Sequence, residues 1–363
     1  MGERFLAIGN EAVGWGAHHA GCQAFFGYPI TPQNEVAEWF SRKFPPEGKV
    51  FLQAPSETSA INLLFGAAAC GARAMTSTSS PGWSLMQETM SHLANAELPC
   101  VVVLVQRGGP GQGTTRHGQM DYLSVTKGGG HGGYKNIVLA PASVQETHDL
   151  MQLAFHLADK YRNPVIVLSD AVIGLTMEWL EPRPLDFGAL PEKEWAIRGR
   201  DRQKDRKKRI VGCSQGLTPW PPYPNYLSLL EALDRKFKLM EAQEVRFDSD
   251  DEGAEVVVVA YGYTAQASRR AVELARQKGL KAGWFRPITL YPFPYEALKQ
   301  RAQRGCRILV VEDSLGQMIE DVRLSVEGRS PIHFLGALAR HSPQEMGLIF
   351  PERIEEEIRR IAG

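Results

Sequence analysis

Short apolar runs alternate with longer amphipathic runs along most of this chain. The apolar runs have the length of buried strands, and the amphipathic runs have the length and period of helices. Parallel strands need long crossover connections, which helices usually supply, so this alternation predicts a doubly wound, parallel α/β sheet. In the first half of the chain the expected strands are 5–8, 24–26, 50–52, 74–76, 101–105, 137–139 and 165–168. The expected helices between them are 10–20, 34–43, 57–69, 85–96 and 144–161.

The alternation also divides the chain into parts. Residues 1–181 are expected to form the first α/β domain. Residues 182–253 change in character, with many prolines and a run at 198–209 that holds eight Lys or Arg, and this predicts a connecting segment. The alternation resumes at residue 254, so 254–363 is expected to form a second, smaller α/β domain. Its expected strands are 256–260, 282–285, 308–311 and 332–334, and its expected helices are 264–278 and 317–327.

Composition excludes several classes of protein. The formal net charge is zero, so no global basic field favours nucleic acid. No apolar run is long enough to span a membrane, and the first residues lack the pattern of a secretory signal, so we expect a cytoplasmic protein. The basic run at 198–209 is either a solvated linker or a docking patch for an acidic partner or for the phosphates of an anionic cosubstrate. It lacks the interleaved aromatic residues of a nucleic-acid site.

The cysteines are scattered. Cys22, Cys70, Cys100, Cys213 and Cys306 form no Cys-x-x-Cys pair and have no His at metal-ligand spacing. We therefore expect no metal site, no iron–sulfur cluster and no disulfide within this chain.

Two prolines bracket a threonine directly after the expected strand 24–26. Pro29 and Pro32 each fix their own φ and favour an extended residue before them, so the hydroxyl of Thr31 is expected on a stiff turn at the end of a strand. Such a turn is suited to positioning a ligand. The alternative is that Thr31 only caps the helix that begins near Asn34.

A glycine-rich loop that carries two arginines follows the expected strand 101–105. Arg107 and Arg116 bound this loop, at the end of a strand where α/β sheets bind ligands. An arginine there can bind a carboxylate through two hydrogen bonds. The alternative is a surface loop whose arginines face water. The separate segment 9–16 lacks both the dinucleotide spacing and the Walker A ending, so it gives little support to nicotinamide or ATP binding.

A glutamate opens the helix that follows the expected strand 50–52. Glu57 is either a structural acid that complements the helix dipole or a buried carboxylate that binds a cofactor ring. Thr31, Glu57 and Arg107 thus follow three strands that a doubly wound sheet can bring together along one edge.

The order of these motifs resembles the alpha-type subunit of 2-oxoacid:ferredoxin oxidoreductases, and within that family the 2-ketoisovalerate (3-methyl-2-oxobutanoate) branch. The resemblance covers the whole first domain and part of the second. The motifs that carry it are Gly9-Asn10-Glu11-Ala12, Tyr28-Pro29-Ile30-Thr31-Pro32-Gln33, Ser56-Glu57, the segment 78–88, Glu97-Leu98-Pro99, Arg107-Gly108-Gly109-Pro110-Gly111, the segments 128–132 and 161–165, and the segment 286–294.

The resemblance implies a fold, an activity and a set of partners. The first domain would be a pyrimidine-type thiamine diphosphate domain, and the last a transketolase C-terminal-like domain. The enzyme would oxidatively decarboxylate a 2-oxoacid to an acyl-CoA and carbon dioxide, and reduce ferredoxin. Mg²⁺ and [4Fe-4S] clusters would lie in partner subunits, a beta, a gamma and a ferredoxin-like delta subunit, in a dimer of heteromers that is active only when assembled.

The resemblance also assigns residues. Glu57 matches the glutamate that hydrogen-bonds the aminopyrimidine ring of the cofactor, and Tyr28 and Pro29 lie in the cofactor-binding motif. Thr31 matches a substrate-contacting threonine, and Arg107 matches the carboxylate-binding arginine. Arg116 stands where many relatives have a substrate-contacting threonine.

That departure leaves the substrate open. A branched-chain 2-oxoacid is the best guess, and 2-oxoglutarate, pyruvate or an aryl 2-oxoacid are alternatives. A thiamine diphosphate transferase that does not use ferredoxin and a non-catalytic structural subunit are the other classes.

Overall fold

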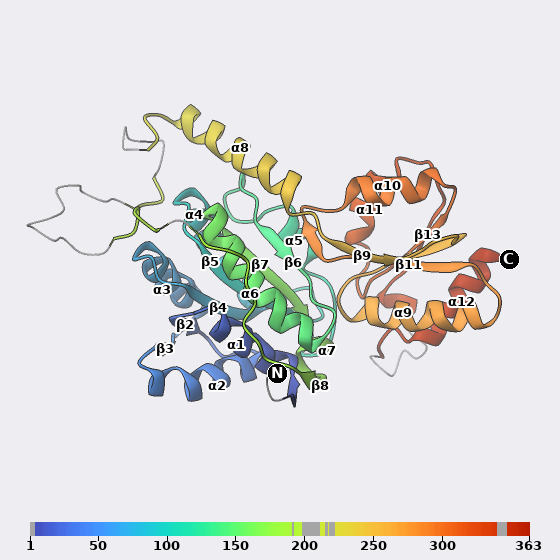
Figure 1. Cartoon of the computed structure of the whole chain (residues 1–363), viewed down its shortest axis with the longest axis horizontal. Coiled ribbons are helices and arrows are strands. Elements are labelled where there is room, and N and C mark those ends of the chain that lie inside the picture. Colours follow the sequence, from blue (N-terminus) through green and yellow to red (C-terminus); the bar gives the residue numbers. More distant parts are fainter. Residues whose placement is uncertain (1–3, 191, 198–210, 215–216, 218–221, 340–346) are drawn as a thin grey trace, which may run out of the picture.

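A seven-stranded sheet forms the centre of the first part of the molecule in the computed structural model, which describes residues 4–190, 192–197, 211–214, 217, 222–339 and 347–363 (Figure 1). Its strands lie in the order β12-β6-β7-β5-β4-β2-β3, and every neighbouring pair is parallel except β12 with β6. The strands are β2 (Ala24–Gly27), β3 (Val50–Gln53), β4 (Ala74–Ser79), β5 (Cys100–Gln106), β6 (Ile137–Leu139), β7 (Pro164–Asp170) and β12 (Thr289–Tyr291). The predicted doubly wound parallel fold is confirmed.

Helices cover both faces of this sheet. One layer holds α1 (Gly9–His19), α2 (Asn34–Lys43) and α6 (Val144–Tyr161), which pack on one another through a buried apolar cluster. The other layer holds α3 (Glu57–Ala69) and α4 (Ser80–Asn95). Shorter elements complete this part, namely a 3₁₀ turn at Pro45–Glu47, α5 (Tyr122–Thr126) and α7 (Ala171–Leu175).

The second sheet has five strands, in the order β14-β13-β10-β11-β9. They are β9 (Phe247–Asp250), β10 (Val256–Val259), β11 (Ala282–Pro287), β13 (Arg307–Val311) and β14 (Ile332–Leu335). The strand β9 is antiparallel to β11 and the others are parallel. Around the sheet lie α9 (Gly262–Gln277), α10 (Tyr295–Gln303), α11 (Met318–Val326), a 3₁₀ turn at Ala337–Ala339 and α12 (Pro351–Ala362).

The first predicted strand has a different partner from the one expected. β1 (Phe5–Ile8) pairs antiparallel with β8 (Met177–Leu180) in a separate two-stranded sheet, so its place in the parallel sheet was predicted wrongly. The reason is close packing between α1 and α7, since a Cβ on Gly9 would lie 2.1 Å from the carbonyl oxygen of Ile173. This contact holds β1, which precedes α1, beside β8, which follows α7.

The expected connecting segment contains more structure than its composition suggested. It holds the long helix α8 (Tyr226–Gln243) as well as β9, and Figure 1 shows α8 lying across the first part of the molecule. The helix is anchored at Glu97, whose carboxylate accepts hydrogen bonds from Lys236 at 2.7 Å and from Tyr223 at 2.6 Å. The basic run at 198–209 lies outside the described residues.

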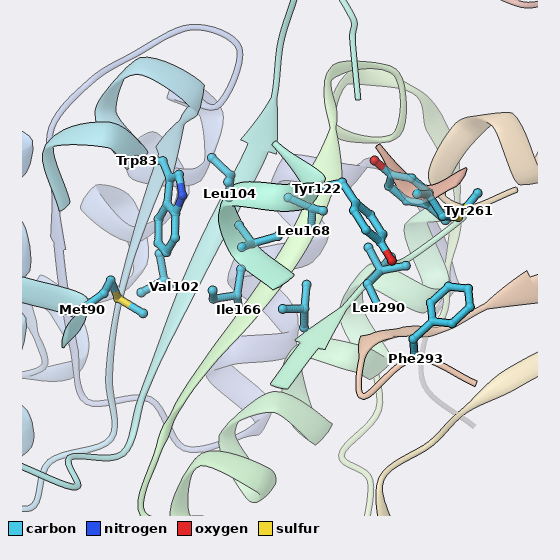
Figure 2. Close-up of a cluster of buried hydrophobic side chains, with 14 of the residues drawn as sticks. Trp83, Met90, Val102, Leu104, Tyr122, Ile166, Leu168, Tyr261, Leu290 and Phe293 are labelled. Carbon is cyan, nitrogen blue, oxygen red and sulfur yellow. The ribbon is translucent and has the colours of Figure 1, made fainter. Parts of the chain in front are cut away.

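The two sheets share one buried apolar cluster. Figure 2 shows the ring of Tyr122 beside that of Tyr261, with centroids 5.8 Å apart, and Leu290 and Phe293 close to them. The same cluster reaches Ile166 and Leu168 in the first sheet. The two parts of the molecule therefore pack through a common core.

None of the helices in the described ranges is long and apolar enough to cross a bilayer. All five cysteines are free, with Cys22, Cys100 and Cys306 buried and Cys70 and Cys213 exposed.

Candidate active site

Four neighbouring parallel strands end at one edge of the first sheet and carry the candidate residues. In the sheet order β5-β4-β2-β3, Arg107 follows β5, Ser80 follows β4, the turn 28–32 follows β2, and Glu57 comes after β3. The carboxyl ends of parallel strands are where open α/β sheets bind ligands. The sheet order therefore brings Thr31, Glu57 and Arg107 to one edge, as the sequence predicted.

Arg107 is the most extensively bonded of these residues. Its side chain is buried, with 6% of the residue exposed. Nη1 donates to the carbonyl oxygen of Thr31 at 2.9 Å. Nη2 donates to the carbonyl oxygen of Gln112 at 2.9 Å and to its side-chain Oε1 at 3.2 Å. The remaining donor, Nε, is buried and has no partner in the described chain. A buried donor without an acceptor is costly, so Nε suits a ligand that supplies an acceptor.

The backbone of Arg107 is fixed from the neighbouring strand. Its N–H donates to the hydroxyl oxygen of Ser80 at 3.0 Å, and this hydroxyl donates in turn to the carboxylate of Asp121. Burial raises the pKa of Asp121 to about 6, against the lowering effects of the Ser80 hydrogen bond and the Arg107 charge. Arg107 and Asp121 are thus linked through one hydroxyl group.

The turn 28–32 is held in place by buried polar side chains. Gln33 donates to the carbonyl oxygen of Tyr28 at 3.3 Å and accepts from the Ser77 hydroxyl at 2.5 Å. Asn10, on α1, donates to the carbonyl oxygen of Pro32 at 2.8 Å. The Asn10 and Gln33 contacts explain why those residue types accompany the turn.

Thr31 is an exposed residue that contacts Arg107 through its carbonyl oxygen. It does not cap the next helix, because α2 begins at Asn34 after Gln33. Tyr28 is half-buried and Pro29 is exposed on the same turn.

Glu57 is a buried residue, 6% exposed, and its carboxylate has no hydrogen-bond partner among the residues that the structure describes. It is the first residue of α3, but the cap is Ser56, whose hydroxyl accepts from the N–H of Ser59 at 3.2 Å. The carboxylate lies instead against the first turn of α4, where a Cβ on Gly82 would be 2.6 Å from its Oε1. An unpaired carboxylate in that position can accept a proton or a hydrogen bond from a bound group.

Arg116 is held by its backbone, next to the residue that follows Arg107. The residue is exposed and its hydrogen bonds are made through the backbone, where its carbonyl oxygen accepts from Gly108 at 3.2 Å and its N–H donates to the hydroxyl of Thr114 at 3.3 Å. These bonds close the loop 108–116. A substrate contact by Arg116 stays a prediction.

Sequence reasoning missed Ser80, Gly82, Gln112 and Asp121. The polar end of β4 was a usable signal for the first two, because Thr76, Ser77, Thr78 and Ser79 are fully buried hydroxyl residues in a strand that ends at the site. Gln112 and Asp121 contact the site through a loop whose path the residue spacing does not determine.

At this sheet edge the carboxylate of Glu57 is an acceptor without a partner in the described chain, and the Nε of Arg107 is a donor without one. Among the described residues no three His, Cys, Asp or Glu side chains converge as a metal site.

Two family models match the chain. Residues 15–215 match the thiamine diphosphate-binding region of pyruvate flavodoxin/ferredoxin oxidoreductases. Residues 254–345 match core domain II of pyruvate:ferredoxin oxidoreductase.

Individual relatives agree with these matches. The chain is 45% identical to the ketoisovalerate oxidoreductase subunit VorB of Methanothermobacter thermautotrophicus, over 99% of this chain and 98% of that subunit. It is 33% identical to the 2-oxoglutarate synthase subunit KorA of Methanothermobacter marburgensis, over 95% and 98% of the two chains.

Among solved structures it resembles a 2-oxoglutarate:ferredoxin oxidoreductase from Magnetococcus marinus that has 2-oxoglutarate, coenzyme A and succinyl-CoA bound. The TM-score is 0.86 at 27% identity, and the match covers 100% of this chain and 66% of that one. The chain therefore belongs to the alpha-type subunits of the 2-oxoacid:ferredoxin oxidoreductase family.

Proposed function

We propose that this chain supplies the cofactor-activating acid and the carboxylate-binding arginine of an enzyme that converts a 2-oxoacid and coenzyme A to acyl-CoA and carbon dioxide while reducing ferredoxin. The observation that carries the proposal is Glu57, a buried carboxylate without a hydrogen-bond partner in the described chain. It lies in the region that matches a thiamine diphosphate-binding family. Thiamine diphosphate, when bound, supplies a carbanion that attacks carbonyl carbon and then stores the electrons of decarboxylation.

Glu57 would act as the acid–base group at the cofactor ring. Its buried carboxylate has a free acceptor oxygen beside Gly82, where no side chain intervenes. A hydrogen bond from a ring nitrogen would satisfy this carboxylate and hold the proton that the ring must exchange. We propose that Tyr28 and Pro29 line the same side of the cofactor.

Arg107 would bind the substrate carboxylate through its open Nε donor. Burial keeps competing water away from the guanidinium, so a carboxylate hydrogen-bonded there is held in one orientation. Thr31 would present its exposed hydroxyl to the substrate, while its carbonyl oxygen keeps Arg107 in place. We propose Arg116 as a substrate contact, which requires its side chain to turn inward.

Ketoisovalerate is the proposed substrate. Identity to a ketoisovalerate oxidoreductase subunit is 45%, compared with 33% for the 2-oxoglutarate synthase subunit. One methylene in an apolar pocket is worth only about 1 to 3 kcal/mol of discrimination, so 2-oxoglutarate, pyruvate and aryl 2-oxoacids belong in the same assay.

The other components are proposed at the level of the family. A beta subunit would hold the diphosphate end of the cofactor with Mg²⁺ and a [4Fe-4S] cluster, and gamma and delta subunits would complete a cytoplasmic dimer of heteromers. Residues 1–181 would form the pyrimidine-type domain and 254–363 the transketolase C-terminal-like domain, joined by 182–253. The range 254–345, which matches core domain II, begins where the second proposed domain begins, whereas the range 15–215 extends past residue 181.

The test is purification of the complex from its native source, followed by a viologen-reduction assay with coenzyme A. We expect thiamine diphosphate and iron–sulfur absorbance in the complex, and the highest kcat/KM with ketoisovalerate among the four 2-oxoacid types. An active complex without iron–sulfur absorbance would indicate a transferase that does not use ferredoxin. Selective loss of activity toward 2-oxoglutarate in Arg116→Ala would place Arg116 at the distal carboxylate.

A further inference from the structure

The guanidinium of Arg107 has one edge suited to a carboxylate. Nε–H and the Nη2 on the side away from Cδ point in the same direction, and a carboxylate that docks on this edge accepts one hydrogen bond from each. The other nitrogen, Nη1, is already bonded to the carbonyl oxygen of Thr31. The edge formed by Nε and Nη2 is the one that includes Nε, the guanidinium nitrogen without a partner in the described chain.

Gln112 occupies half of that edge. Its side-chain Oε1 lies 3.2 Å from Nη2, and its own carbonyl oxygen lies 2.9 Å from the same atom. Nε, the other half, is buried and has no partner in the described chain. The two hydrogens of Nη2 thus already have two acceptors, both from Gln112, and a carboxylate that docks on Nε and Nη2 must displace one of them. The amide oxygen is the one carried on a side chain.

The loop that carries Gln112 is closed at its base and exposed at its tip. The N–H of Thr114 donates to the carbonyl oxygen of Gly108 at 2.8 Å, and a Cβ on Gly113 would lie only 1.7 Å from that oxygen. Gln112 itself is exposed. Its side chain can therefore rotate away from Arg107 into solvent without disturbing a packed core.

We propose that the Gln112 side chain competes with the substrate carboxylate for Arg107, and so sets the KM for the 2-oxoacid without taking part in the chemistry. This inference rests on the proposed function of Arg107. A neutral amide oxygen accepts a weaker hydrogen bond than a carboxylate does, so the substrate displaces it, and the guanidinium stays partly satisfied when the site is empty.

The test compares two substitutions at one position in the assembled complex. In Gln112→Glu the tethered carboxylate binds Nε and Nη2 itself, so we expect the KM for the 2-oxoacid to rise about tenfold or more, with kcat at saturation within about twofold of the unchanged enzyme. In Gln112→Ala the competitor is gone, so we expect KM to fall about two- to fivefold. Gln303→Glu, at an exposed position at the end of α10, adds the same charge elsewhere and controls for net charge.

Two results would overturn the inference. A KM in Gln112→Glu that matches that in Gln303→Glu would show that residue 112 does not reach the substrate edge. A KM that rises in Gln112→Ala would show that Gln112 binds the substrate instead of competing with it. Direct titration of the complex with 2-ketoisovalerate gives the same comparison without turnover. If Gln112→Glu weakens binding of 2-ketoisovalerate, but the unchanged complex does not reduce viologen either, the proposed function is contradicted and the inference is kept.

Discussion

Glu57 and Arg107 are two buried charges at the same sheet edge, each 6% exposed, yet they are satisfied in opposite ways. Arg107 is bonded to segments that follow three different strands, namely the turn after β2, Ser80 after β4 and its own loop after β5. Glu57 has no hydrogen bond in the described chain and lies against the bare backbone of Gly82.

The contrast shows which half of the site this chain completes by itself. The arginine is oriented before any ligand arrives, because its position follows from bonds within the chain. The carboxylate is left for a group from outside, which we propose is the cofactor. Unsatisfied buried groups of this kind reduce stability and are retained at functional sites.

The largest effect is expected at Glu57. Glu57→Gln keeps the shape of the side chain but removes its ability to hold a proton, so turnover in the viologen assay should fall by a factor of about 100 or more. Glu252→Gln, at an exposed position, should leave turnover unchanged. Turnover that survives Glu57→Gln would contradict the assigned role and indicate a structural subunit.

Arg107→Lys tests the other buried charge, the arginine proposed to bind the substrate carboxylate. A lysine replaces the fork with a point charge and cannot bond Thr31, Gln112 and substrate in fixed directions. We expect KM for the 2-oxoacid to rise about 10- to 100-fold with the cofactor still bound, and kcat to change less. The assay uses substrate saturation curves, with the exposed Arg42→Lys as the matched control. If KM stays the same, Arg107 is not the carboxylate site.

Gly82 tests whether the open space beside Glu57 is needed. A Cβ there would lie 2.2 Å from the Thr78 hydroxyl and 2.6 Å from Oε1 of Glu57, so Gly82→Ala should destabilise the chain by about 1 to 3 kcal/mol and displace the carboxylate. Gly66 lies within α3, where an added Cβ would meet no atom within 4 Å beyond its own helix backbone, so Gly66→Ala should stabilise by about 0.5 to 1 kcal/mol. Urea unfolding measures both. If Gly82→Ala and Gly66→Ala change the free energy of unfolding equally and in the same direction, the Glu57 carboxylate tolerates a side chain at residue 82.

The smallest effect is expected at Asp121, which is linked to the backbone of Arg107 through the Ser80 hydroxyl. Burial raises its pKa from the usual 3.8 to about 6, so between these pH values the unfolded chain releases its proton before the folded chain does. The free energy of unfolding should therefore fall as pH rises from about 4 to about 6 and stay level above.

Asp121→Asn should flatten this part of the pH profile and stabilise the chain by roughly 1 to 2 kcal/mol at pH 7. Burial also raises the pKa of Asp170 to about 6, so part of the slope should remain. A slope that is unchanged in Asp121→Asn would show that Asp121 ionises normally.

The sequence predicted that the candidate residues lie along one edge of the sheet, because the end of each strand and the order of the strands in the chain are local properties. Thr31, Glu57 and Arg107 each follow an apolar run, and parallel strands end on one side. It could not predict that the carbonyl oxygen of Thr31 would accept a hydrogen bond from Arg107. Every residue type has a main-chain carbonyl, so such a contact does not depend on which residue is present. Nor could it place Asp121, which reaches Ser80 only through the path of an irregular loop.

The errors in the fold have related causes. The composition of 182–253 suggested a linker because prolines and basic residues surround α8, while the contacts that stabilise this helix come from Glu97, far away in the sequence. β1 has the apolar character of a buried strand, but its outward residue Leu6 is 51% exposed and pairs with Trp179 of β8 across the ribbon. Apolar character predicts a strand without predicting its partner.

The strand β12 has a consequence for synthesis. It comes from the second part of the chain, yet it supplies the outer strand of the first sheet by pairing with β6. A growing polypeptide that has released residues 1–253 from the ribosome still lacks this strand, and β6 presents an open edge that can pair with another chain. The first sheet therefore cannot be completed until residues up to Tyr291 have been synthesised, and the two halves cannot be produced separately and mixed without exposing that edge.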